Sequence, residues 1–226
     1  MRERVVPGDE MAAAGWAAGR IADLLAAAVQ ERGRASLALS GGRSPWAMME
    51  DLFARDLPWE RVDVLQVDER VAPDGHDQRN WTRIASLLAA SPAAAASAHP
   101  MRVGDGADAA VRDYLGVLAG LDGPIDVVQL GLGDDGHTAS LAPGDPVLDV
   151  VDAPVAATAR AFNGTVRVTL TYPALDGARN VLWLVTGAPK AEMARRLEAG
   201  DTSIPAGRVT AASQVLVLDR AAAGED

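Results

Sequence analysis

The sequence predicts an α/β domain in which helices flank a mostly parallel sheet. Two observations support this prediction. Short apolar runs alternate along the chain with longer segments of helical periodicity, which is the pattern of strands joined by helical crossovers. Glycines and polar residues follow several of the apolar runs, where the chain must turn at the edge of the sheet. The 226 residues suffice for one sizeable core, so we expect a single domain over residues 1–226.

The first predicted element is a helix between Asp9, a favoured N-cap residue, and Gly33, a favoured C-terminal stop. Apolar residues recur between them at helical spacing, at Ile21, Leu24, Leu25, Ala28 and Val29. Strand-like runs follow at residues 35–40, 62–67, 125–130, 166–171, 180–186 and 214–218. Helical segments lie between several of these runs, at residues 46–55, 79–90, 107–121 and 189–199.

Composition narrows the class of protein. A hydrophobic content of 49% with 23% charged residues is ordinary for a soluble globular domain. The chain has no cysteine, which excludes disulfides and Cys-ligated metals, and its formal net charge of -10 argues against a nucleic-acid surface. Charged residues and a proline interrupt the N-terminal segment, so we expect neither a signal peptide nor an apolar run of transmembrane length. We therefore predict a cytoplasmic protein that binds neither nucleic acid nor a membrane.

The first strand-like run leads into SGGRSP, residues 40–45. Gly41 and Gly42 precede a helix that we expect to begin at Pro45, a favoured first helical residue. Exposed backbone N–H groups and the helix dipole make such a turn a candidate phosphate cradle, to which Arg43 and Ser44 add donors. The spacing is not that of a Walker loop. The alternative is a tight strand-to-helix turn without a ligand.

The most distinctive stretch is IDVVQLGLGDDGHTASLAPG, residues 125–144, which places His137 directly after a buried strand. GLGDDG matches the dinucleotide fingerprint GxGxxG, but Asp134 and Asp135 would repel a pyrophosphate and no long helix follows. We therefore reject a dinucleotide site. His137 is either a structural histidine or a catalytic one, whereas His76 and His99 are expected in exposed loops.

Further charged residues follow other strand-like runs. Asp68, Glu69 and Arg70 follow the run at residues 62–67. Arg167 lies at the start of the run at residues 166–171, and Lys190 follows the run at residues 180–186. Each could be an ordinary charge of a solvated loop. However, ligands of open parallel sheets bind beyond the carboxyl ends of the strands, where most of these groups fall. Their convergence predicts one site at that edge.

Together these motifs resemble bacterial 6-phosphogluconolactonases. SGGRSP, VDER with Arg79 and Asn80 downstream, LGLGDDGHTASLAPG, RVTLT and LVTGAPKAEM occur in that family's order and approximate spacing, from Ser36 to the C-terminal VLVLDRAAA. The resemblance implies a Rossmann-like fold of the glucosamine-6-phosphate deaminase/ribose-5-phosphate isomerase type. It also implies hydrolysis of 6-phosphoglucono-δ-lactone in the pentose phosphate pathway, without a metal or organic cofactor.

Two other readings stay open. The related glucosamine-6-phosphate deaminases carry a glutamate in DGHIAFNEPG, where this chain has Ser140, Leu141 and Ala142 before Pro143, so the lactonase is favoured. A non-catalytic sugar-phosphate sensor usually carries a DNA-binding module, for which this chain offers neither length nor basic charge. The chain also departs from the family's pattern, with Ser44 in place of a threonine and Gln78-Arg79-Asn80 in place of Asp-Ser-Asn.

Lactone hydrolysis needs an activated water, a place for the oxyanion and a hold on the phosphate. We assign His137 as general base, because the pKa of histidine lies near neutrality, with Asp135 or Asp68 orienting it. Backbone N–H groups of residues 131–136 or the Arg70 side chain could stabilise the oxyanion. The residues predicted to bind the phosphorylated sugar lactone are Ser40, Gly41, Gly42, Arg43, Ser44, Arg70, Arg79, Arg167 and Lys190.

Overall fold

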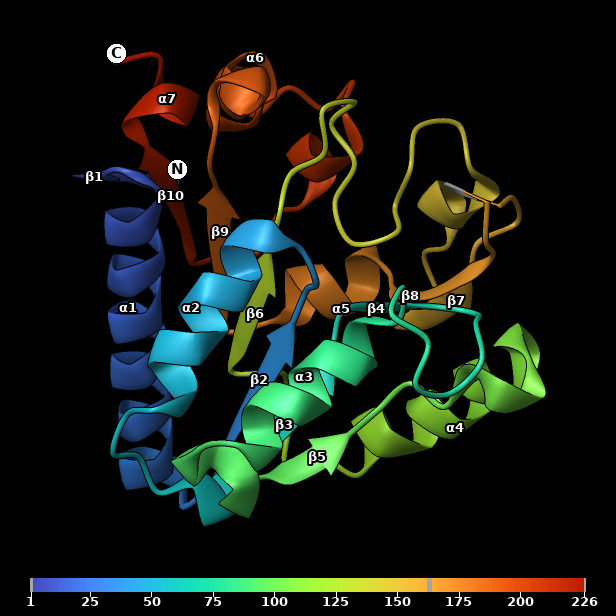
Figure 1. Ribbon diagram of the computed structural model, residues 1–226. Coiled ribbons are helices and arrows are strands. Elements are labelled where there is room, and N and C mark those ends of the chain that lie inside the picture. Colours follow the sequence, from blue (N-terminus) through green and yellow to red (C-terminus); the bar gives the residue numbers. More distant parts are fainter. Residues whose placement is uncertain (1, 162–163, 226) are drawn as a thin grey trace.

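The computed structural model describes residues 2–161 and 164–225 (Figure 1). Within these residues, seven strands form a sheet in the order β1-β10-β9-β6-β2-β3-β5, and all neighbours are parallel. The strands are β1 Glu3–Gly8, β2 Ala35–Leu39, β3 Val62–Gln66, β5 Ser97–His99, β6 Val127–Leu130, β9 Asn180–Val185 and β10 Gln214–Asp219. The predicted α/β fold with a mostly parallel sheet is therefore confirmed.

A smaller antiparallel sheet lies beside the parallel one. It consists of β4 Asp68–Arg70, β8 Arg167–Leu170 and β7 Val155–Ala157, in the order β4-β8-β7. The run at residues 166–171, which the sequence presents as one more strand of the alternation, belongs to this second sheet. Hydrophobicity shows that a strand is buried but does not show which strand it pairs with.

Helices cover both faces of the parallel sheet (Figure 1). Helices α1 Glu10–Arg32, α2 Arg43–Phe53 and α3 Asn80–Ala89 pack on one face. Helices α4 Ala107–Ala119, α5 Tyr172–Gly177 and α6 Ala191–Glu198 pack with the small sheet on the other, and the short α7 Arg220–Ala223 follows β10. Each face of the sheet thus has its own hydrophobic core, and alternate residues of β10 belong to different cores. Val215 and Val217 pack in the core beneath α1, α2 and α3, whereas Leu216 and Leu218 pack in the core on the other face.

Helix α1 has the ends that the sequence predicts. The Asp9 side chain accepts a hydrogen bond from the Ala12 N–H at 2.9 Å, and Gly33 adopts the left-handed conformation with φ 78°. Contrary to the expectation from sequence, α1 is long and apolar enough to cross a membrane by length and composition alone. Its apolar residues, such as Ile21 and Leu25, are buried against the sheet, and this packing accounts for its composition.

Two other local expectations need correction. Helix α2 begins at Arg43 rather than at Pro45. The N–H groups of a helix's first turn have no intrahelical acceptor, so a proline, which lacks an N–H, fits at the third position of the helix as well as at the first. His99 is not in an exposed loop; it lies on the edge strand β5, and its Nε2 is 2.8 Å from Asp63 Oδ1.

The strand order creates a crevice. From β2 the chain adds β3 and β5 on one side, and from β6 it adds β9 and β10 on the other. The loops that follow β2 and β6 therefore leave adjacent strands in opposite directions. In open parallel sheets this switch point, at the carboxyl ends of the strands, is the usual place for a ligand.

Candidate active site

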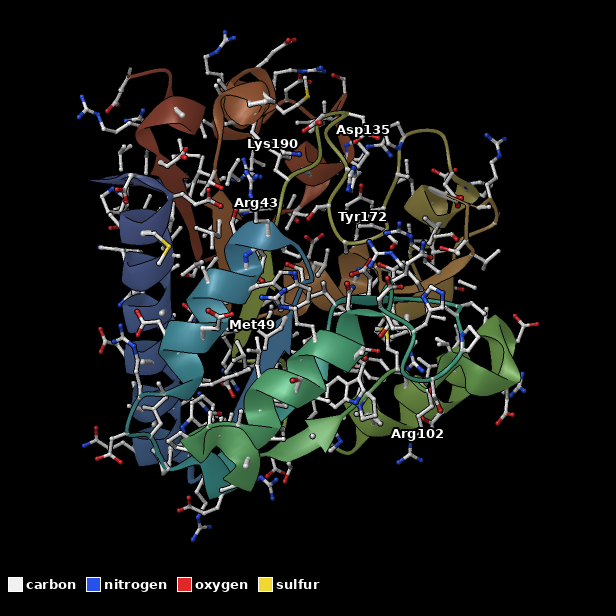
Figure 2. All side chains as sticks on the ribbon, in the orientation of Figure 1. Arg43, Met49, Arg102, Asp135, Tyr172 and Lys190 are labelled. Carbon is white, nitrogen blue, oxygen red and sulfur yellow. The ribbon has the colours of Figure 1, made fainter. Side chains whose placement is uncertain are left out.

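A cavity of about 360 Å³ lies at this switch point. Segments that follow β2, β3, β6 and β9 line it, and Arg167 reaches it from β8. Figure 2 shows Arg43, Asp135 and Lys190 at this end of the molecule, whereas Arg102 lies at the opposite end. All the predicted site residues line the cavity except Asp135 and Arg79. Those that do are Ser40, Gly41, Gly42, Arg43, Ser44, Asp68, Arg70, His137, Arg167 and Lys190.

His137 is paired with Asp135. The imidazole Nδ1 lies 2.5 Å from Asp135 Oδ1, and the backbone N–H of His137 donates to the same oxygen at 3.0 Å. Partial burial opposes ionisation of Asp135, but the hydrogen bonds from His137 outweigh it and lower the pKa of the carboxyl. An ionised carboxylate only accepts hydrogen bonds, so a neutral imidazole carries its proton on Nδ1 and its lone pair on Nε2.

The turn between β6 and His137 depends on a glycine. A Cβ atom placed on Gly133 would overlap the His137 ring at Nδ1, Cε1 and Cγ, so the ring packs directly on the backbone of this residue. Backbone hydrogen bonds close the turn: the Gly133 N–H donates to the His137 carbonyl at 2.8 Å, and the Gly136 N–H donates to the Gly133 carbonyl at 3.1 Å. Nearby, Ala139 has φ 49°, a left-handed conformation that residues other than glycine seldom adopt.

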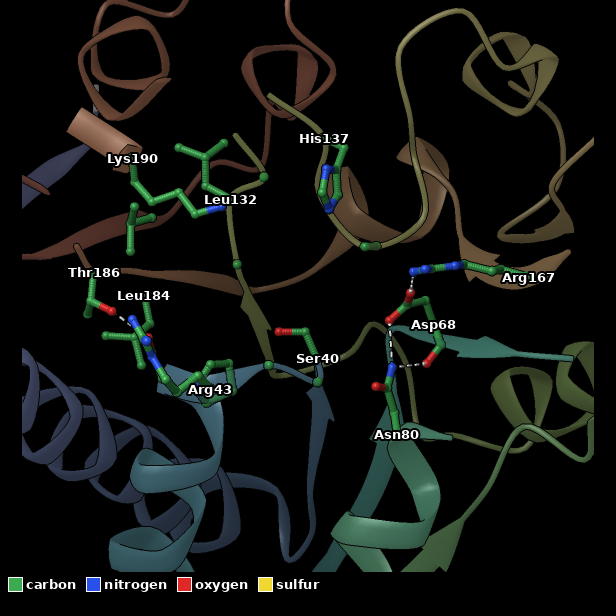
Figure 3. A pocket seen from close by; sticks show the side chains of 18 of the residues that line it. Ser40, Arg43, Asp68, Asn80, Leu132, His137, Arg167, Leu184, Thr186 and Lys190 are labelled. Atoms are coloured by element: carbon green, nitrogen blue, oxygen red, sulfur yellow. Dashed lines mark hydrogen bonds and ion pairs between the residues drawn. The ribbon is translucent and has the colours of Figure 1, made fainter. Parts of the chain in front are cut away.

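Asp68 lies beside Arg167 and Asn80 in the cavity, and its partners differ from those of Asp135 (Figure 3). Its Oδ2 accepts from Ser140 Oγ at 2.5 Å and lies 3.6 Å from Arg167 Nη1, and its Oδ1 accepts from Asn80 Nδ2 at 3.1 Å. Burial lowers the pKa of Arg167, and the negative charge of Asp68 acts in the opposite direction. Between the two candidate carboxylates, Asp135 is therefore the one bonded to His137, and Asp68 is an anchor for Arg167.

Arg70 and the glycine turn after β2 meet at Asn80. Arg70 Nη1 donates to Asn80 Oδ1 at 2.8 Å and to the Gln78 carbonyl at 2.9 Å. A Cβ atom on Gly41 would overlap the Asn80 amide, so only glycine allows this approach. Asn80 thus connects the SGGRS turn with Asp68 and Arg70.

Figure 3 places Arg43, Thr186 and Lys190 on the side of the cavity opposite Asp68 and Arg167. Arg43 Nε lies 3.3 Å from Glu10 Oε1, and Ser44 Oγ donates to the same oxygen at 3.2 Å and also contacts Thr186 Oγ1. Ser40 Oγ donates to Gln129 Oε1 at 2.8 Å. The Lys190 ammonium contacts the carboxylate of Asp134. On this side of the cavity the N-terminus of α2 therefore lies with two cationic side chains, Arg43 and Lys190.

Arg79 does not line the cavity. Its guanidinium is buried, with Nε 3.6 Å from Glu69 Oε2, and it donates to Asp74 and to the Met101 carbonyl. It thus ties the loop before α3 to the region that follows β5.

Glu69 is fully buried and holds the start of helix α3 in place. Its carboxylate accepts from the backbone N–H groups of Arg70, Asn80 and Trp81, each at 2.8 Å, and from Gln66 Nε2 at 2.9 Å. A charged group at this place satisfies helix N-terminal N–H groups that have no intrahelical acceptor. Asn80, and through it the Arg70 side of the cavity, depends on this carboxylate.

We expect the Glu69→Gln variant to lose about 1–3 kcal/mol of unfolding free energy, because the new amide group faces buried donors and leaves at least one without an acceptor. Denaturant unfolding measures this loss. The control is Glu50→Gln, which removes an exposed ion pair to Arg83 and is expected to cost less than about 1 kcal/mol. Equal stability of the two variants would show that the buried network is dispensable.

Several residues of the site have no signal in the sequence. In the sequence, Thr186 is the last residue of an apolar run and Ser140 is a small residue in a loop. Only the tertiary fold brings Thr186 to Ser44 and Ser140 to Asp68. Glu69 could be taken for a solvated loop charge. Within the part of the chain that the structure describes, no group of three or more histidine, aspartate and glutamate side chains is placed to hold a metal ion.

Comparisons with known proteins agree with the motifs. The model of the family glucosamine-6-phosphate isomerases/6-phosphogluconolactonase matches residues 8–218. A 6-phosphogluconolactonase of Rhizobium meliloti (strain 1021) is 39% identical over 181 residues, which cover 77% of this chain and 78% of that protein. A 6-phosphogluconolactonase of Mycobacterium tuberculosis is 34% identical over 224 residues, which cover 91% of each chain.

The fold also agrees with that of a solved 6-phosphogluconolactonase. The crystal structure of a 6-phosphogluconolactonase from Shewanella baltica superposes with a TM-score of 0.89 at 27% identity, and the superposition covers 97% of each chain. The family match includes the strand ends that carry Ser40, His137 and Lys190. With sequence and fold in agreement over most of its length, the chain belongs to the glucosamine-6-phosphate isomerase/6-phosphogluconolactonase family, which its motifs had indicated.

Proposed function

We propose that this chain is a cytoplasmic 6-phosphogluconolactonase, a single catalytic domain that hydrolyses 6-phosphoglucono-δ-lactone to 6-phosphogluconate in the pentose phosphate pathway. The observation that carries the proposal is the His137–Asp135 pair, with His137 lining a cavity that arginine and lysine side chains also line. The relatives named 6-phosphogluconolactonase support the choice of reaction. The absence of the deaminase glutamate, with Ala142 before Pro143, argues against the amino-sugar reaction.

In the proposed mechanism, Asp135 keeps the His137 proton on Nδ1, and Nε2 takes a proton from water as that water attacks the lactone carbonyl carbon. The carbonyl oxygen becomes an oxyanion, which Arg70 or the backbone N–H groups of residues 131–136 stabilise. When the tetrahedral intermediate collapses, the bond to the ring oxygen breaks. The imidazolium then returns the proton to that oxygen, which becomes a hydroxyl, and the product acid ionises.

The phosphate is assigned to residues 41–44 and Lys190, with Arg167 facing it from the opposite side of the cavity. The backbone N–H groups at the start of α2 and the side chains of Arg43 and Ser44 supply donors, and Lys190 supplies a point charge. Binding energy at this remote dianion holds the lactone carbonyl against His137. Because the chain as a whole is acidic, attraction of an anionic substrate depends on this local cluster.

Lys190→Ala is expected to raise KM for the phosphorylated lactone about tenfold or more with a smaller change in kcat, because Lys190 contacts the phosphate and no reacting atom. Steady-state kinetics separates the two parameters. Arg195→Ala, which removes a cation of α6 that does not line the cavity, is the control. An unchanged KM in the Lys190 variant would remove this residue from the phosphate site.

The reaction itself is tested by following freshly generated 6-phosphoglucono-δ-lactone by NMR with and without the enzyme, since the lactone also opens spontaneously. Acceleration over the enzyme-free control is the expected result. Release of ammonia from glucosamine 6-phosphate would instead identify a deaminase. Binding of sugar phosphates with no turnover of either substrate would identify a sensor.

A further inference from the structure

The two cations that we assign to the phosphate on one side of the cavity each contact a carboxylate of the same chain. The Lys190 ammonium contacts Asp134, and Arg43 Nε lies 3.3 Å from Glu10 Oε1. Ser44 Oγ donates to that Glu10 oxygen at 3.2 Å. A phosphate that reached these groups would have to take the place of the carboxylates. Of the two, Asp134 is the more informative, because it belongs to the loop that also carries Asp135 and His137.

The Asp134 carboxylate can leave Lys190 without disturbing the turn. Its side chain is 71% exposed, whereas that of Lys190 is 27% exposed. Backbone hydrogen bonds hold the turn, from the N–H of Gly133 to the carbonyl of His137 and from the N–H of Ala206 to the carbonyl of Gly136. Neither bond uses the Asp134 side chain. The ion pair with Lys190 is therefore accessible to a competing anion and is not needed for the local fold.

The charges of the competitors favour a phosphate. A phosphate monoester carries about -1.5 to -2 charges near neutral pH and has three strong acceptor oxygens, whereas a carboxylate carries a single charge. Exposed ion pairs contribute little to stability, so a dianion can displace Asp134 from Lys190. Displacement nevertheless has a cost, which every phosphorylated ligand bears and which an unphosphorylated sugar lactone does not.

We propose that Asp134 is an internal competitor for phosphate at Lys190 and thereby sets the affinity of the site for phosphorylated ligands. The inference rests on the proposed function only in taking Lys190 as a phosphate ligand. It assigns to Asp134 a role in affinity and specificity, separate from orienting His137. Asp134 lowers the affinity for free phosphate and raises KM for the phosphorylated lactone.

Calorimetric titration with inorganic phosphate at about pH 8, where phosphate is a dianion, tests the proposal without any need for turnover. Asp134→Asn is expected to tighten phosphate binding about two- to fivefold, the scale of an exposed ion pair. Asp152→Asn makes the same change of charge at an exposed position outside the cavity and is expected to leave the dissociation constant unchanged. Asp134→Ala provides a second variant should the asparagine fail to fold.

The outcomes separate the inference from the function. If Lys190→Ala weakens phosphate binding but neither Asp134 variant tightens it, Asp134 is not a competitor and only the inference fails. If Lys190→Ala binds phosphate as the wild type does, the phosphate site itself is wrongly assigned. The ion pair would instead be structural if the Asp134 variants melt earlier and bind phosphate more weakly than the wild type, and this result also overturns the inference.

Kinetics provides an independent readout. The Asp134→Asn variant is expected to show a lower KM for 6-phosphoglucono-δ-lactone and an unchanged KM for glucono-δ-lactone, which has no phosphate to place on Lys190. The preference for the phosphorylated substrate then rises in the variant. Equal changes in KM for both lactones would contradict competition at Lys190.

Discussion

Replacing His137 with asparagine is expected to lower kcat by about 10²–10⁴-fold, which is the usual contribution of a general base, and to change KM little. Asparagine retains hydrogen-bonding capacity but cannot take the proton of the attacking water. The measurement is kcat by NMR or a coupled assay on freshly generated lactone, after subtraction of the spontaneous reaction. The residual rate should reflect positioning of the substrate and stabilisation of the oxyanion alone.

The matched control is His76→Asn, at an exposed histidine outside the cavity, and it should turn over like the wild type. The result is informative only if the His137 variant is folded, and an unchanged thermal unfolding curve would establish this. A His137 variant with near wild-type kcat would remove the imidazole from the mechanism and leave it a structural role.

Gly133→Ala is expected to lower kcat by about 10²-fold, because even a displacement of about 1 Å at a reacting group can cost this much. The new methyl group would overlap the His137 ring at Nδ1, so the ring must move away from Asp135 or the turn must open. In either case the proposed general base leaves its position, although neither His137 nor Asp135 is altered. Kinetics and a crystal structure of the variant would record the displacement.

The control for this variant is Gly116→Ala in helix α4, where nothing lies within 4 Å of the new Cβ atom. There the substitution should be tolerated or slightly stabilising, since alanine favours helix more than glycine does. Full activity of the Gly133 variant with the ring still bonded to Asp135 would show that the close packing on Gly133 has no catalytic importance.

Local chemistry explains which parts of the fold were predictable. The ends of α1 depend on Asp9 and Gly33, whose effects are confined to neighbouring residues, and both were predicted correctly. Strand β1 was missed because it is a partly exposed edge strand with Pro7 near its end, and it is a strand only by pairing with β10. Arg167 lies at the start of β8, as it does in the predicted run at residues 166–171, and what the sequence did not show is the pairing of β8 with β4, which brings Arg167 to the cavity.

The same distinction holds for the site. His137 and Lys190 could be found because each follows a recognisable buried strand, and parallel strands bring their carboxyl ends to one edge. The choice between Asp68 and Asp135 as the partner of His137 could not be made, since it depends on the backbone of one turn. Glu69 was hidden for another reason: its burial is compensated by donors from α3, which lies more than ten residues further along the chain.

In the proposed mechanism, the Asp135 carboxylate affects the product as well as the base. Hydrolysis of a lactone creates a new carboxylate at the carbon that the activated water attacks, so the product has one more negative charge than the substrate. Because its pKa is lowered, Asp135 is already ionised when this charge appears close to His137. Like charges repel each other, so the ionised Asp135 disfavours a new carboxylate beside His137, in a chain whose formal net charge is already -10. We therefore expect the product acid to bind more weakly than the lactone, although both carry the same phosphate, and such a difference limits inhibition by the product.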